Sequence, residues 1–199
     1  MDLVPTLISS GWASGVNAYL TVALLSLLGR AGWGEVPGSL QSDGVLIAAL
    51  GLFAIEFVAD KIPYVDNLWD AVHTAVRPAI ASTLGVVLAG DSGSTGLEEA
   101  LSGGGSGAMA LASHAVKAGV RLGVNTSPEP FSNILVSLTE DGLVAGVVLL
   151  ALDHPVPAAV ITVVLLVAGA ALAVFFIKRI RHTLRVLQRR LGRPPPRPG

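Results

Sequence analysis

The stretch EFVADKIPYVDNLWDAVHTAVRP, residues 56–78, decides how this chain is interpreted, because it places ionisable side chains between two apolar segments. Its 23 residues include four carboxylates, a lysine, a histidine and an arginine. A carboxylate at membrane depth costs several kcal/mol unless it is paired, hydrated or protonated. The stretch therefore predicts a functional site, provided that the surrounding chain lies in a membrane.

The composition places the chain in the membrane class. Of its 199 residues, 52% are hydrophobic and 14% are charged, and the mean hydropathy is +0.68, whereas soluble domains carry about 25% charged residues. The absence of cysteine excludes disulfides, thiol nucleophiles and cysteine metal sites. Eight of the 13 Lys and Arg side chains follow Ile177. This basic tail, residues 178–199, predicts a cytoplasmic C-terminus in contact with anionic lipid, and no nucleic-acid partner is expected.

The apolar segments predict an all-α, polytopic helical membrane protein with one membrane domain, residues 1–177, of roughly four to six membrane segments. Only Ser9–Leu28 and Val156–Ile177 are long enough to cross the bilayer comfortably. Four shorter apolar segments, residues 44–59, 79–89, 107–124 and 142–152, favour short, interrupted or re-entrant helices shielded by the rest of the bundle or by a second subunit.

An acidic Gly/Ser-rich linker, residues 91–106, separates two blocks, about 44–90 and 107–155, that are similar to each other. With an offset of 67 the matched pairs are Pro63 and Pro130, Asp66 and Asn133, Asp70 and Ser137, and His73 and Glu140. The spacings of +3, +7 and +10 after the proline put the polar members on one helical stripe. Two repeat-related blocks with interrupted helices are typical of a transporter site formed between the halves.

The first block predicts an ion site. Glu56 and Asp60 share a helix face, and Asp66, Asp70 and His73 lie on one stripe of the next helix. Carboxylates that converge with an imidazole suit a divalent metal ion, with Asp66, Asp70 and His73 as its ligands, or a proton relay. The alternatives are that Asp60 and Lys61 only cap a helix at the water interface, and that the second stripe is the polar face of an amphipathic interfacial helix.

The second block supplies cations. His114, Lys117 and Arg121 share one stripe of a Gly/Ala-rich helix, where they either pair with the carboxylates of the first block or extend to the phosphate surface. Other polar residues are expected to support the site: Asn17, Asn125, Ser127, Glu129 and Asn133. Asn17 is deep in the first apolar segment and either bonds another helix or binds a ligand.

The pattern E-x-x-x-D-K-x-P-x-x-D-x-x-x-D-x-x-H-x-x-x-R-P at residues 56–78 resembles a family of small bacterial membrane proteins catalogued as a domain of unknown function. The pattern H-x-x-K-x-x-x-R-x-x-x-N-x-S-P-E-P-x-x-N at residues 114–133, with the following Glu140–Asp141, resembles the same family. The resemblance covers most of residues 1–177. It implies a multi-pass protein of the bacterial inner membrane and implies no activity.

We expect a transporter or channel for a cation, either a divalent metal or a proton-coupled ion. The ion-binding candidates are Glu56, Asp60, Asp66, Asp70, His73, His114, Glu140 and Asp141, and the counter-charges are Lys61, Arg77, Lys117 and Arg121. The alternatives are a carrier of an anionic or lipid-phosphate substrate held by those cations, a non-catalytic scaffold whose tail recruits a partner, or an intramembrane enzyme. A second copy of the chain is a further candidate partner, as a homo-oligomer. No hydrolase, zinc peptidase or nucleotide-binding motif is present, so an enzyme is not the expectation.

Overall fold

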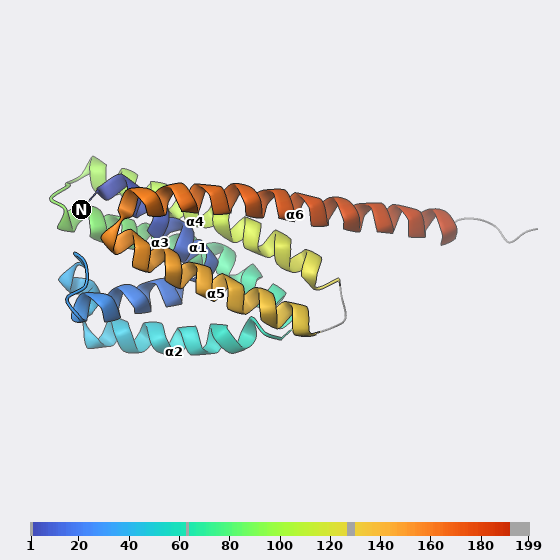
Figure 1. The fold of residues 1–199 in the computed structure, drawn as a ribbon, viewed down its shortest axis with the longest axis horizontal. Helices are drawn as coiled ribbons and strands as arrows, with labels where there is room; N and C mark the ends of the chain where they lie inside the picture. The colour runs from blue at the N-terminus through green and yellow to red at the C-terminus, as the bar shows by residue number, and fades with distance from the viewer. Residues whose placement is uncertain (1, 63, 127–129, 192–199) are drawn as a thin grey trace, which may run out of the picture.

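The computed structural model describes residues 2–62, 64–126 and 130–191, and this part of the chain is all-α (Figure 1). Its helices are α1 (Leu3–Arg30), a short 3₁₀ helix η1 (Gly38–Gln41), α2 (Asp43–Ala59), α3 (Val65–Asp91), α4 (Leu97–Val124), α5 (Pro130–Asp153) and α6 (Pro155–Leu191). Consecutive helices from α2 to α6 run in alternating directions, and α6 extends well beyond the bundle.

Four of the described helices are long and apolar enough to cross a membrane: Leu3–Arg30, Val65–Asp91, Phe131–Asp153 and Pro155–Val186. Many large apolar side chains on α2 and α6 are exposed, as expected for helices in contact with lipid. These features are those of a multi-pass membrane protein. The bundle has a loop end, with the N-terminus and the turns before α2, α4 and α6, and a tail end, toward which α6 extends (Figure 1).

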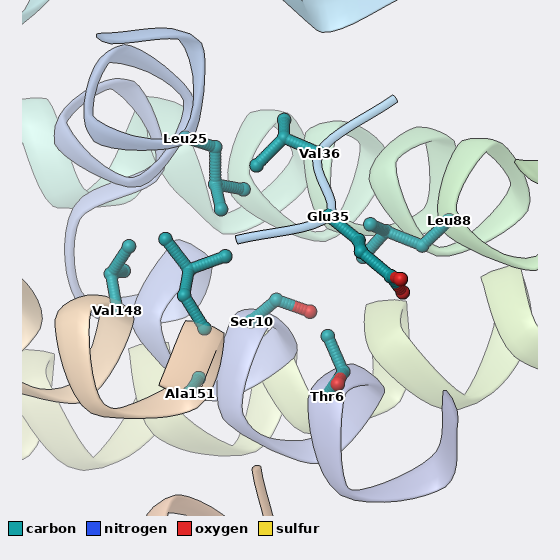
Figure 2. A pocket seen from close by; sticks show the side chains of 9 residues that line it. Thr6, Ser10, Leu25, Glu35, Val36, Leu88, Val148 and Ala151 are labelled. Atoms are coloured by element: carbon teal, nitrogen blue, oxygen red, sulfur yellow. The ribbon is translucent and has the colours of Figure 1, made fainter. Parts of the chain in front are cut away.

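The first helix is folded back on itself. A straight 28-residue helix is about 42 Å long, yet Asp2, before α1, and Gly34, after it, line the same pocket. Thr6 and Ser10 of the first half also line one small cavity of about 20 Å³ with Leu25 of the second half (Figure 2). The two halves of α1 therefore form a hairpin whose ends both lie at the loop end.

The bend of α1 is at Asn17, the one non-helical residue within it (φ −150°, ψ 97°). This extended conformation is typical of a helix N-cap. The Asn17 side chain accepts a hydrogen bond from the backbone N–H of Leu20 at 2.9 Å, and Thr21 Oγ1 donates to its backbone carbonyl at 2.8 Å. Asn17 thus begins the second half of α1, so the predicted first membrane helix is interrupted at its centre.

The tightest helix contacts in the bundle depend on glycine. α3 packs most extensively against α4, and a Cβ atom on Gly103 would lie 2.9 Å from the carbonyl oxygen of Ser82. A Cβ on Gly15, beside the α1 bend, would lie 2.7 Å from Cα of Ala110 in α4. Small residues let helix backbones approach closely, and here they hold α1, α3 and α4 together.

The helices differ from the expected segments in their continuity. The short apolar segments 79–89 and 142–152 are not separate helices, because each continues the polar-faced helix before it as part of α3 or α5. Pro78 does not start a new segment either, since α3 continues through it. Most of the predicted linker is helical, with only residues 92–96 between α3 and α4, and the helical part of the basic tail continues α6.

Candidate functional site

An inner cluster of ionisable side chains surrounds Arg77 of α3, which is completely buried. Its guanidinium donates from Nη2 to Glu56 Oε1 of α2 at 2.5 Å and from Nη1 to His114 Nδ1 of α4 at 2.7 Å. Nη1 also lies 3.1 Å from Asp70 Oδ1. Three helices thus contribute ionisable groups to one buried point, roughly 18 Å along α3 from its first residue.

The contacts of His114 fix its protonation state. Arg77 can only donate hydrogen bonds, so Nδ1 of His114 must be the unprotonated nitrogen. The other nitrogen, Nε2, lies 3.1 Å from Thr74 Oγ1, and that hydroxyl donates to the carbonyl of Asp70. His114 is therefore neutral, with its proton on Nε2. A second proton on Nδ1 would require Arg77 to move away.

His73 adds a second imidazole to the inner cluster. Its Nδ1 lies 2.8 Å from the Trp69 carbonyl, and a ring nitrogen beside a carbonyl oxygen must donate. Its Nε2 pairs with the Tyr19 hydroxyl at 2.9 Å, just after the α1 bend. The Trp69 ring stacks on the imidazole at a centroid distance of 4.5 Å. These contacts hold the ring in one orientation, with a proton on Nδ1.

The α1 bend contacts both a cation of α3 and a cation of α4. Arg77 Nη1 donates to the Gly15 carbonyl at 3.3 Å, and Lys117 Nζ donates to the Val16 carbonyl at 3.0 Å. These carbonyls belong to the last turn of the first half of α1, where unpaired C=O groups and the helix dipole favour positive charge. The polar side chains of the network therefore meet the bent helix at its tip.

An outer cluster, nearer the tail end, surrounds Arg121 of α4. The guanidinium donates to Glu140 Oε2 at 2.5 Å, to the Asp60 carbonyl at 2.6 Å and to Asn133 Oδ1 at 2.9 Å. Asp60 Oδ2 also accepts from Lys117 at 2.7 Å. Arg121 is fully buried, and its five donors serve groups from α5 and from the turn after α2.

Asp66 and Asp141 complete the outer part. Asp66 Oδ2 lies 3.5 Å from Arg121 Nη1 and accepts from Asn125 Nδ2 at 2.8 Å. Asp141 Oδ1 accepts from Asn17 Nδ2 at 3.0 Å, and its Oδ2 lies 4.0 Å from Lys61 Nζ. Lys61 also donates to Ser137 at 3.3 Å.

The comparison with protein families fits this part of the chain. Residues 4–175 match the family described as Domain of unknown function (DUF4126). The chain belongs to the DUF4126 family. No curated protein and no solved structure matches it. The DUF4126 match covers all of the network residues just described, while the basic end of α6 lies outside it.

The network of this DUF4126 chain carries more acid than base. Six carboxylates (Glu56, Asp60, Asp66, Asp70, Glu140, Asp141) face four permanent cations (Lys61, Arg77, Lys117, Arg121), which leaves two negative charges in excess with both histidines neutral. Several buried carboxylate oxygens accept no hydrogen bond, including Glu56 Oε2, Asp60 Oδ1 and both oxygens of Asp70. Of these, Asp70 Oδ1 has its ion pair with Arg77. Buried acceptors without a hydrogen bond are rare in folded proteins and call for an explanation beyond packing.

The structure thus brings the sequence-predicted carboxylates and cations together, but it divides the proposed metal ligands. Asp66 faces Arg121, whereas Asp70 faces Arg77 and His73 faces Tyr19. Within the described residues no group of three such side chains is placed to hold a metal ion. Ser127 and Glu129 lie outside the described residues.

Sequence reasoning missed three kinds of group: the Tyr19 hydroxyl, the Thr74 hydroxyl and the backbone carbonyls of the α1 bend. Thr74 could have been found, since it directly follows His73 and lies four residues after Asp70 on the same helix. The carbonyls carry no signal in the residue pattern.

Proposed function

We propose that this chain is a membrane carrier for protons or a small cation, in which the buried acidic and histidine groups form the ion pathway. The excess of two negative charges inside the bundle carries this proposal. Such an excess is costly at membrane depth unless protons or a cation balance it. The Asp70 oxygens, which accept no hydrogen bond although Oδ1 lies 3.1 Å from Arg77 Nη1, supply acceptors for either.

The pathway in this proposal starts at the tail end and stops at the α1 bend. Asp66, Asn125 and Arg121 lie within about one turn of the helix ends there, and the inner cluster lies deeper. In the membrane α1 is a re-entrant hairpin that fills the half of the bundle near the loop end. The lysines and arginines after residue 177 put the tail end on the cytoplasmic side, in the inner membrane of a bacterium.

The proposal includes a conformational change that protonation of His114 drives. A proton on His114 Nδ1 displaces the Arg77 guanidinium, because two donors cannot share that position. Arg77 also holds the Gly15 carbonyl, so its movement loosens the α1 tip that closes the pathway. Proton uptake is in this way linked to opening toward the loop end.

The anion carrier is the weaker alternative. Each buried cation already has a carboxylate within 4.0 Å, and Arg77 and Lys117 donate to helix carbonyls as well. An anion would have to compete with carboxylates that the fold itself supplies. A scaffold, in which the network only fixes helix packing, would not require the two excess negative charges that this network carries.

The deciding experiment measures ion flux into liposomes that contain the purified protein and an internal pH indicator, with a potassium gradient and valinomycin as the driving force. We expect Asp70→Asn to reduce proton flux by at least about tenfold, because it removes from the pathway a carboxylate that can take up and release a proton. The matched control is Asp43→Asn, whose carboxylate pairs with Arg30 outside the network. Its flux should equal that of the native chain.

Each other outcome overturns the proposal. Flux that survives Asp70→Asn but is lost in Arg121→Gln, with an anion gradient as its requirement, identifies an anion carrier. Native protein that moves no more protons than empty liposomes supports a scaffold. Unfolding midpoints in detergent for each variant separate a loss of pathway from a loss of fold.

A further inference from the structure

A lateral groove of about 330 Å³ opens between α4, α5 and α6 and reaches the first half of α1. α5 and α6 meet at the turn near His154 and diverge toward the tail end (Figure 1). Most of the wall of the lateral groove is apolar, with Trp12, Val120, Leu135, Leu143, Leu165 and Leu172 among the lining residues. A volume above 300 Å³ with apolar walls and few polar groups is typical of a small-molecule site.

The polar groups of the lateral groove are unequal in their availability. The Ser113 hydroxyl donates to the Trp12 carbonyl at 3.0 Å, and the Thr139 hydroxyl donates to the Leu135 carbonyl at 2.8 Å. Both hydroxyl protons are therefore engaged within the protein. The remaining polar lining residues are Lys117 and Glu140, which carry opposite charges.

Exposure decides which of the two charges a ligand meets. The Lys117 side chain is 2% exposed, whereas the Glu140 side chain is 15% exposed. The Lys117 ammonium is also occupied by Asp60 and by the Val16 carbonyl. Glu140 uses Oε2 for its short bond with Arg121, while Oε1 has only a 3.4 Å contact with Arg121 Nε. Glu140 Oε2 also lies 3.7 Å from Lys117 Nζ, so Glu140 is the more exposed member of an ion pair that lines the lateral groove.

We propose that the lateral groove binds a lipophilic organic cation, an ammonium or phosphonium centre with apolar substituents, with Glu140 as its counter-charge. The apolar wall buries the substituents, and the carboxylate compensates the charge that leaves water. An anionic amphiphile meets Glu140 first and is repelled. This inference rests on the proposed function and names its substrate class, because Glu140 also belongs to the outer cluster and links the lateral groove to the proton pathway.

The test compares two probes of equal shape and opposite charge, tetraphenylphosphonium and tetraphenylborate, by equilibrium binding to the purified full chain in detergent. We expect the phosphonium to bind at least about tenfold more tightly than the borate. In Glu140→Gln this preference should disappear. If the borate binds equally well or better in the native chain, the proposal is wrong.

A second variant keeps the test decisive if Glu140→Gln does not fold. Leu165→Trp narrows the lateral groove without touching the charges, and we expect it to weaken phosphonium binding about tenfold. The matched control, Val167→Trp on the exposed face of α6, should bind as the native chain does. Phosphonium binding that neither Leu165→Trp nor Glu140→Gln changes is adventitious and overturns the proposal.

The failures of the two proposals are distinguishable. Proton flux that depends on Asp70, without charge-selective binding in the lateral groove, refutes the proposed organic-cation site and leaves the proposed carrier function standing. Charge-selective binding without any proton flux refutes the proposed carrier function and leaves the organic-cation site standing.

Discussion

At the scale of single residues, the pair of Glu56 and Arg77 shows why ionisable groups survive in this bundle. Both side chains are completely buried and joined at 2.5 Å. Replacing one member of a buried pair leaves the other charge uncompensated, which costs far more than the pair itself contributes. The pair is therefore a constraint on the position of α2, which otherwise packs mainly against α1.

Glu56→Gln should lower the free energy of unfolding by roughly 3–5 kcal/mol, because Arg77 stays buried with one carboxylate fewer. The measurement is a denaturant titration in detergent micelles, followed by circular dichroism. Asp43→Asn breaks the exposed pair with Arg30 and should change stability by no more than about 1 kcal/mol. Equal effects of the two substitutions would show that Glu56 is hydrated rather than buried.

Much of the site could be predicted at this scale, since charge in an apolar chain is conspicuous. The stripe from Asp66 to Arg77 and the stripe from His114 to Arg121 do face each other. Their individual partners could not be read from spacing. Asp66 and Asp70 lie one turn apart on one face, yet they pair with different arginines, because the partner depends on the depth at which α4 packs against α3.

At the scale of elements, the hairpin in α1 is the feature that hydropathy hides. Asn17 stands out as a lone polar residue in the sequence, but the apolar run on both sides of it predicts one continuous membrane helix. The reversal depends on the N-cap at Asn17 and on the close approach of Gly15 to α4. The N-cap is a local contact and the approach to α4 is a tertiary one, and neither can be inferred from the pattern, since an asparagine in a continuous helix would give the same residues.

The α1 bend gives the second prediction of stability. Gly15→Ala should destabilise the protein by roughly 1–3 kcal/mol, because the new Cβ would lie 2.7 Å from Cα of Ala110 and the backbones must separate. Gly51→Ala is the control, since a Cβ at that position in α2 meets nothing within 4 Å and alanine favours a helix. Thermal unfolding in the same detergent compares the two variants. A loss of stability in Gly51→Ala that equals the loss in Gly15→Ala would rule out close packing as the cause.

The continuity of the helices was the other property that could not be predicted from the sequence. The Gly/Ser-rich residues 97–106 have a linker-like composition, but in α4 they form the surface against which α3 packs, as at Gly103. Their small size is a packing requirement rather than a sign of flexibility. The repeat between the two blocks stays a prediction. Each block contains two antiparallel helices. Of the two prolines that align the blocks, Pro63 lies outside the described residues.

At the scale of the whole molecule, charge and the hairpin together predict how the bundle is oriented in the membrane. Acidic side chains gather at the loop end (Asp2, Glu35, Asp43, Asp91, Glu98, Glu99, Asp153), and the described cations Lys178, Arg179, Arg181 and Arg185 extend from the tail end. From the positive-inside rule we predict that the loop end lies outside the cell. Because α1 folds back on itself, the beginning of α1 lies at the loop end, opposite the end toward which the basic part of α6 extends.

This orientation can be measured cleanly because the chain has no cysteine. Single substitutions Asp2→Cys, Gly38→Cys and Thr95→Cys mark the loop end, and Thr183→Cys marks the tail end. We expect an impermeant maleimide to label the first three in intact cells, and to label Thr183→Cys only after the membrane is permeabilised. A straight α1 that crosses the bilayer would instead put Asp2 and Gly38 on opposite sides. Labelling of only one of these two in intact cells would therefore refute the re-entrant hairpin, and with it the closed end of the proposed pathway.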